Sequence, residues 1–150
     1  MSDPVLDLTD PATLLGTWAL ARVVDDRLAG AESLVDGRLL LTEVEPGRIR
    51  WQESGRWHRP TGEVDVRRGL WLERVDGGSW WVRFEDGTDF HPWSPGVTVT
   101  HPCSPDTYVG LVSGGGDTWV IRWDVTGPSK DYTMTTELTR WVSRRGADGP

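Results

Sequence analysis

The chain has 150 residues and carries 16 basic against 23 acidic side chains, which gives a formal net charge of −7. This charge repels nucleic acid and anionic membrane surfaces alike, and no apolar run approaches the roughly 18 residues that a transmembrane helix needs. We therefore expect neither nucleic acid nor a membrane as a partner, and the length predicts one domain with a sizeable core.

Cysteine usage and the N-terminal residues point to a reducing compartment. The single cysteine, Cys103, cannot form an intramolecular disulfide. The opening residues MSDPVLDLTDP lack both the basic start and the apolar stretch of an export signal. Both observations favour a cytoplasmic protein.

The N-terminal segment contains one helix signal. Asp10 followed by Pro11 is typical of an N-cap and a first helical position, so residues 11–15 are expected to form one helical turn. We accordingly divide the chain into an N-terminal tail with this turn (1–13), a barrel (14–143) and a flexible C-terminal tail (144–150).

Beyond the helical turn the chain has the pattern of short strands. Segments rich in Val, Leu, Ile, Trp and Thr are separated by Gly, Pro and Asp-Gly turns at a spacing of about 8–12 residues, which is typical of sandwiches and barrels. In 118–126, Trp119, Ile121, Trp123 and Val125 share one face, as a half-buried strand requires. Closing such a sheet on itself removes its edges, so we expect an all-β fold, a single closed antiparallel up-and-down β-barrel.

Two turns make local predictions. Asp86-Gly87 indicates a two-residue hairpin between RFE and TDF. If 94–97 is also a turn, the segments around His91 and His101 pair as a hairpin and bring the two imidazoles close together.

The ends of the strand region resemble the lipocalin and calycin families. In those barrels a Gly-x-Trp indole on the first strand lies against an arginine from the last strand, and Gly16-Thr17-Trp18 and Arg140 stand in these places. A guanidinium there stacks on the ring and donates to backbone carbonyls. The resemblance implies a structural closure by Trp18 and Arg140.

A second resemblance covers most of the chain. Four motifs in one order are similar to the domain-of-unknown-function family 6314, whose barrels resemble lipocalins. They are Gly16-Thr17-Trp18 with Arg22; Phe84-x-Asp86-Gly87 with Phe90-His91; His101-Pro102-Cys103 with Asp106 and Tyr108; and Gly127-Pro128-x-Lys130-Asp131-Tyr132 with Arg140. The resemblance implies a lipocalin-like fold and carries no known activity.

The candidate catalytic residues are His91, His101, Asp106, Tyr108 and Lys130. Histidine titrates near neutral pH, so the two imidazoles could act as an acid and a base, or could simply bond to backbone at the barrel rim. Asp106 and Tyr108 share one strand face and need a buried cationic partner, for which Lys130, the only lysine, and Arg22 are candidates. They form either a ligand clamp or a structural network.

Other site chemistries receive less support. Cys103 and His101 are separated by a proline, which rarely lets a thiolate meet an imidazole. Metal-ligand spacing of the Cys-x-x-Cys or His-x-x-x-His kind is missing, so we expect neither a metal nor a cofactor. Haem on one histidine, as in nitrobindin-like barrels, stays open, although their glycine-rich segment does not follow Trp18.

The ten tryptophans either fill the core or line a binding cavity. Barrels of this size hold one small ligand, and a flat aromatic wall suits a planar or apolar molecule. We expect ligand contacts from Trp51, Trp71, Trp123, Tyr132 and Arg22.

Three functions are compatible with these residues. The first is a barrel that binds a largely apolar or aromatic small molecule and anchors it through the polar cluster. The second is a cofactor-independent enzyme, such as an isomerase, cyclase or hydrolase, in which the same residues act as acid and base. The third is a structural or interaction module.

Overall fold

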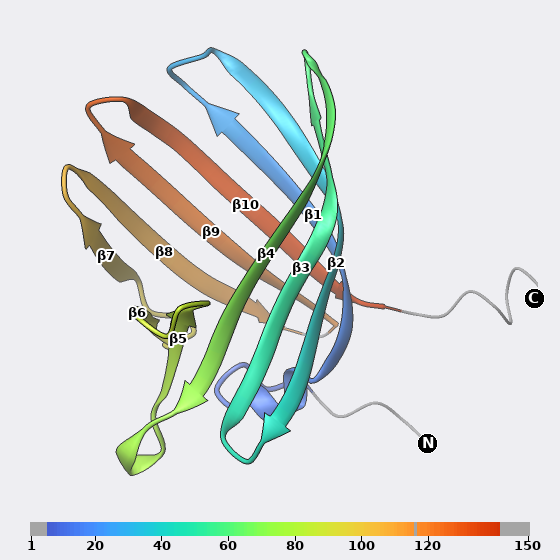
Figure 1. Ribbon diagram of the computed structural model, residues 1–150, viewed down its shortest axis with the longest axis vertical. Helices are drawn as coiled ribbons and strands as arrows, with labels where there is room; N and C mark the ends of the chain where they lie inside the picture. The colour runs from blue at the N-terminus through green and yellow to red at the C-terminus, as the bar shows by residue number, and fades with distance from the viewer. Residues whose placement is uncertain (1–5, 116, 142–150) are drawn as a thin grey trace, which may run out of the picture.

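The computed structural model describes residues 6–115 and 117–141, which form one antiparallel sheet with two short 3-10 helices (Figure 1). The helices are η1 (Pro11–Leu14) and η2 (Asp76–Gly78). The strands are β1 (Gly16–Asp26), β2 (Ala31–Glu45), β3 (Arg48–Arg59), β4 (Gly62–Arg74), β5 (Trp80–Phe84), β6 (Asp89–Pro92), β7 (Val99–Cys103), β8 (Asp106–Gly115), β9 (Thr118–Gly127) and β10 (Lys130–Arg140). Residues 144–150, expected to be a flexible tail, lie outside the described part of the chain.

The sheet is an up-and-down barrel, as expected from the strand pattern. Its strand order is β6-β5-β4-β3-β2-β1-β10-β9-β8-β7, so chain neighbours pair throughout and β1 pairs with β10. The barrel is nearly but not fully closed. Its two edge strands, β6 and β7, are not hydrogen-bonded to each other. The expected hairpin between the His91 and His101 segments is therefore wrong, and the barrel seam runs between them.

The Asp86-Gly87 turn joins β5 and β6 as a hairpin, but its loop is longer than the two residues expected. β5 ends at Phe84 and β6 begins at Asp89. The Gly87 N–H donates to the Phe84 carbonyl at 2.9 Å, and the Phe84 N–H donates to the Thr88 carbonyl at 2.8 Å. Gly87 has a φ of +90°, which a side chain would disfavour.

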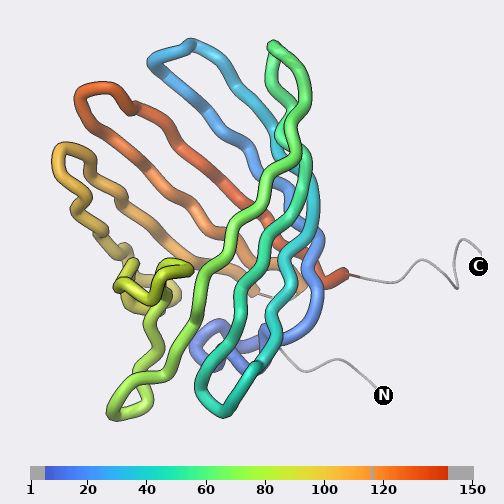
Figure 2. Tube along the Cα trace, viewed as in Figure 1, coloured from blue at the N-terminus to red at the C-terminus, as the bar shows by residue number. Residues whose placement is uncertain are grey.

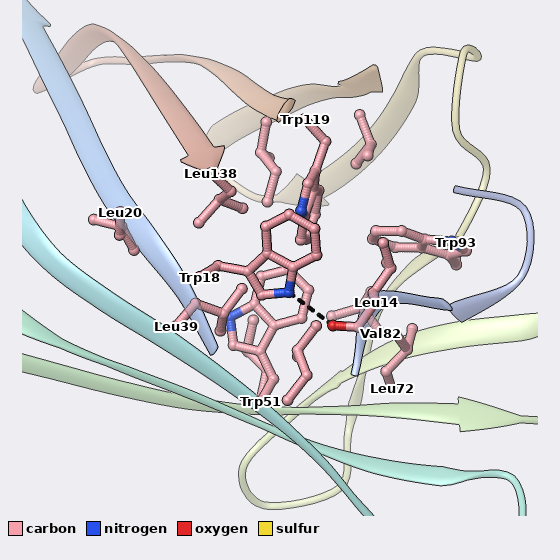
Figure 3. Close-up of a cluster of buried hydrophobic side chains, with 14 of the residues drawn as sticks. Leu14, Trp18, Leu20, Leu39, Trp51, Leu72, Val82, Trp93, Trp119 and Leu138 are labelled. Carbon is pink, nitrogen blue, oxygen red and sulfur yellow. Dashed lines mark hydrogen bonds between the residues drawn. The ribbon is translucent and has the colours of Figure 1, made fainter. Parts of the chain in front are cut away.

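The lower end of the barrel is filled by tryptophan (Figure 3). Trp119 from β9 makes edge-to-face contacts with Trp18, Trp51 and Trp93, at ring-centroid distances of 5.6, 5.9 and 6.0 Å. Such aromatic pairs stabilise a core by about 0.5–1.5 kcal/mol beyond the area they bury. This cluster forms the floor of the barrel.

Helix η1, which directly precedes β1, packs against this floor at the lower end of the barrel. Asp10 caps it as expected by accepting from the Ala12 N–H at 3.1 Å, and Leu14 is fully buried. The Trp18 indole donates to the Leu14 carbonyl at 2.7 Å (Figure 3). The lower end is thus closed by packing and by a buried hydrogen bond.

Arg140 holds the same end together. Its guanidinium lies 4.3 Å from the Trp18 ring centroid and donates to the carbonyls of Leu15 and Thr13, both at 3.2 Å. Trp18 and Arg140 are also direct register partners between β1 and β10. The first and last strands therefore meet at this contact.

The upper part of the barrel is open on one side. β5 pairs only with Leu70–Arg74 of β4, so the preceding residues 62–69 of β4 have a strand partner on one edge only. Figures 1 and 2 show the long hairpins β1–β2, β3–β4 and β9–β10 rising well above the short strands β5 and β6. An opening in the wall results between β4 and the β7–β8 hairpin.

Candidate functional site

Three charged side chains meet on the inner face of the barrel, just above the tryptophan floor. The Arg22 Nε donates to Thr136 Oγ1 at 2.7 Å, and its Nη2 donates to Glu53 Oε1 at 2.9 Å. Arg68 Nη2 donates to Glu53 Oε2, also at 2.9 Å. We call Arg22, Glu53 and Arg68 the inner charge cluster.

Glu53 is the centre of this cluster and is only 7% exposed. Its Oε2 also accepts from the Trp51 indole at 2.9 Å. Burial alone would raise the pKa of this carboxyl group, but the charges of Arg68 and Arg22 and the hydrogen bonds from Arg68 and Trp51 lower it to about 2. Glu53 is therefore a carboxylate at any physiological pH.

The cluster lies beside three hollows that have lining residues in common. A cavity of 210 Å³ is lined by Arg22, Glu53 and Arg68 together with Leu20 and Met134. Arg22 and Met134 also line a 350 Å³ cavity that extends upward past Trp57 and Tyr132. Arg68 also lines the opening in the wall, whose volume is 640 Å³.

An aromatic row of three stacked rings lies at the opening. Phe84 stacks on Phe90 with ring centroids 4.5 Å apart, and Phe90 stacks on Trp123 at 5.1 Å. Gly110 makes room for this row, since a Cβ atom there would lie 2.6 Å from the Trp123 ring. Phe84 and Phe90 line the opening, so flat apolar surface faces the cavity.

The two histidines lie near each other against Phe90, one buried and one at the opening. The ring centroids of His91 and His101 are 4.7 and 5.1 Å from that of Phe90. His91 is 6% exposed and its Nδ1 donates to the Pro92 carbonyl at 2.8 Å. Burial, outweighing that hydrogen bond, lowers the pKa of His91 to about 4. The imidazole is therefore neutral at physiological pH.

Asp106, Tyr108 and Lys130 form a second polar group near the mouth. The Lys130 ammonium donates to the Tyr108 hydroxyl at 3.0 Å and lies 3.1 Å from Asp106 Oδ2. Its hydrogen bonds to Tyr108 and Asp106 raise the pKa of Lys130, which keeps the ammonium charged. His101 adjoins this group, at 6.1 Å from the Tyr108 ring centroid.

The expected ligand contacts divide between three places. Arg22 and Tyr132 line an interior cavity, whereas Trp123, stacked on Phe90, and Trp51, in the floor, are buried. Trp71, expected on the inner face, lies on the outer face, where the Arg48 and Arg50 guanidiniums cover its ring at 3.7 and 4.8 Å. The reason is the strand alternation, because Leu70 and Leu72 take the inward positions.

Sequence reasoning missed Glu53 and Arg68. The available signal was their place in the alternation: each occupies an inward position in a strand whose other inward residues are apolar, with Trp51 before Glu53 and Leu70 after Arg68. A charged residue in an apolar phase predicts a buried partner. Two residues of opposite charge at inward positions of neighbouring strands, such as Glu53 and Arg68, are therefore expected to pair with each other.

The described residues otherwise offer little for metal or membrane chemistry. Within 6–115 and 117–141, His, Cys, Asp and Glu side chains do not form a group of three or more that could hold a metal ion. Neither short helix in this part of the chain has the length and apolarity to cross a membrane.

Fold and site together define a ten-stranded up-and-down β-barrel with an aromatic floor and a charged interior. The chain belongs to a family of unknown function, DUF6314, whose pattern matches residues 14–140.

Curated relatives and solved structures give two further likenesses. Heme chaperone HemW from two strains of Mycobacterium tuberculosis is 36% identical over 99 residues, which is 63% of this chain. The chain spans only 21% of the length of these relatives. The S-type phycobiliprotein lyase CPES from Guillardia theta has a similar structure, with a TM-score of 0.60 and 12% identity over 86% of this chain and 89% of the lyase. This second likeness concerns the fold.

Proposed function

We propose that this protein binds a flat, largely apolar small molecule inside the barrel. The observation that carries the proposal is the aromatic row Phe84–Phe90–Trp123, of which Phe84 and Phe90 line a 640 Å³ opening in the barrel wall. Binding pockets for small organic ligands have volumes of about 300–1,000 Å³ and combine apolar walls with a few placed polar groups. Flat rings favour a planar ligand, because offset stacking maximises contact with them.

Haem is a suitable first probe. It is flat and largely apolar, and the curated relatives carry the name heme chaperone. The match covers a fifth of their length, so haem serves here only as a probe of the flat interior.

The charge states of the polar groups favour binding over acid–base catalysis. Glu53 stays ionised, buried His91 stays neutral, and Lys130 stays protonated over the physiological range. A catalytic acid or base works best with a pKa near the working pH, and none of these three pKa values lies there. Fixed charges of this kind orient a ligand without exchanging protons.

We also propose that the protein works in the cytoplasm, because the exposed Cys103 stays reduced there.

The experiment is a fluorescence titration with N-phenyl-1-naphthylamine, a neutral flat probe that brightens in apolar surroundings, and a parallel absorbance titration with hemin. Saturable one-to-one binding of the neutral probe is expected. Phe84→Leu, which removes a ring that lines the opening, should weaken it by about two- to tenfold through the loss of stacking. The control is Trp71→Leu, which removes a ring on the outer face and should leave binding unchanged. Lack of saturable binding by either probe, or equal effects of the two variants, would contradict the proposal.

A further inference from the structure

The inner charge cluster carries more positive than negative charge. Arg22 and Arg68 contribute two guanidiniums and Glu53 one carboxylate, with salt-bridge distances of 2.9 Å on both sides. The Glu53 and Arg22 side chains are 6% and 11% exposed, and that of Arg68 is 35% exposed toward the opening. Placing a net positive charge inside an apolar barrel is unfavourable unless an anion compensates it.

The hydrogen bonds of the cluster leave donors unused on the arginines. Both Glu53 oxygens are occupied, one by Arg22 and the other by Arg68 and Trp51. A guanidinium has five N–H donors, and the bonds just described use two from Arg22 and one from Arg68. The Arg68 Nε is buried without a hydrogen-bond partner. Both carboxylate oxygens of the cluster are thus already bonded, while several guanidinium N–H donors have no partner within it.

The cavity beside these donors contains no other acid. Among the residues that line the 210 Å³ cavity, Glu53 is the single carboxylate, and apolar Leu20, Val66 and Met134 form much of the remainder. Carboxylates do occur farther out, but they have partners of their own: Glu85 pairs with Arg50, and Asp86 accepts from Thr88. The cavity therefore has donors and space, and its lining lacks a second carboxylate.

A pair of facing glycines, one of which lines this cavity, lets β2 and β3 approach closely beside it. Gly37 of β2 lies opposite Gly55 of β3, and these are flanked by Leu20 on β1 and Val66 on β4. A Cβ atom on Gly37 would lie 2.0 Å from the Ser54 carbonyl oxygen, and one on Gly55 would lie 2.3 Å from that of Asp36. The close approach of the strands requires glycine, and bare backbone borders the charge cluster.

We propose that the ligand is an organic monocarboxylate whose acid group binds Arg22 and Arg68, with its flat apolar part directed toward Phe90 and the opening. This inference rests on the proposed binding function and specifies its ligand class. A carboxylate matches the planar fork of a guanidinium, and one negative charge neutralises the net charge of the cluster. A dianionic phosphate would instead leave a negative charge uncompensated in the apolar interior.

The test compares 1-pyrenebutyric acid with its methyl ester, two probes with the same flat body that differ in charge. Binding to the intact chain is followed through quenching of tryptophan fluorescence. The acid should bind about ten- to hundredfold more tightly than the ester, the ratio expected for hydrogen bonds to a charged group. Tighter binding of the ester, or equal binding of the two, would overturn the carboxylate assignment while leaving the binding function intact.

A pair of variants locates the acid group. Arg68→Gln removes one donor of the cluster while Arg22 and Trp51 still bind Glu53, and it should weaken binding of the acid about ten- to hundredfold and of the ester little. Arg122→Gln is the matched control, since it makes the same charge change on the outer face of β9, where the side chain is 58% exposed. Equal loss of acid binding in both variants would overturn the site. Failure of both probes to bind the unaltered chain would instead contradict the proposed function itself.

Discussion

The lowered pKa of Glu53 predicts how much folding stability the chain loses when Glu53 is replaced by Gln. Burial raises this pKa, but the arginine charges and the hydrogen bonds from Arg68 and Trp51 outweigh burial and lower the pKa from 4.5 to about 2. At about 1.4 kcal/mol per pKa unit, this corresponds to about 3 kcal/mol of folding free energy. Because the folded-state pKa is the lower one, this stabilisation is complete above pH 4.5 and is lost as the pH falls toward 2.

The assay is urea denaturation of wild type and Glu53→Gln at several pH values, followed by tryptophan fluorescence. Near neutral pH the variant should be less stable by about 3–5 kcal/mol, because two arginines lose their buried carboxylate. The gap should narrow by about 3 kcal/mol as the pH falls from about 6 to about 2, since only the wild type has this carboxylate to protonate.

Glu85→Gln is the control for that measurement. It removes a carboxylate that is 65% exposed and that pairs with Arg50 outside the barrel, so it should change stability by about 1 kcal/mol at most. A stability gap between wild type and Glu53→Gln that stays constant from pH 6 to pH 2, or one no larger than that of Glu85→Gln, would refute the reasoning.

The remaining predictions concern three other contacts. The wild type should lose stability as the pH falls from 6.5 to about 4, because folding lowers the pKa of His91 and the unfolded chain takes up the proton first. His91→Gln should remove this loss, and unfolding free energies at pH 7 and pH 4 check it. Arg140→Ala should lower the unfolding free energy by about 1–3 kcal/mol through loss of the Trp18 contact and two hydrogen bonds, whereas Arg122→Ala should change it little; an unchanged melting temperature for Arg140→Ala would contradict the closure. Asp106→Asn and Lys130→Met should together destabilise the chain less than the sum of the single variants, and strict additivity in thermal melts would show that the two groups do not interact.

The fold could be predicted from the sequence because its signals are local. Alternation in 118–126 places Trp119, Ile121, Trp123 and Val125 on one face, and all four are buried. Asp10 and Pro11 specify the helical turn through capping geometry, which needs no tertiary information. Consecutive short strands with tight turns then favour an up-and-down sheet.

The face of Trp71 and the position of the barrel seam could not be predicted in the same way. In 70–72 all three residues are apolar, so this segment by itself does not say which phase points inward, although Val64 and Val66 earlier in β4 share the phase of Leu70 and Leu72. The arginines that cover Trp71 come from β3. The seam depends on how far strands β4 and β5 overlap, which the turn signals do not specify.

The inner charge cluster was visible in the sequence only in part. Arg22 could be predicted as a ligand contact, but its partners lie 31 and 114 residues away along the chain. Their meeting depends on the register of β1 with β10 and of β2 with β3, and a shift of one residue would turn these side chains to the other face.

A crystal structure of the complex with 1-pyrenebutyric acid tests the central claim most directly. The account predicts carboxylate oxygens within hydrogen-bond distance of the Arg22 and Arg68 guanidiniums, and pyrene rings against Phe84 and Phe90 at the opening. A probe bound on the outer face beside Trp71, or one whose carboxylate lies at Lys130 instead of the inner charge cluster, would contradict it.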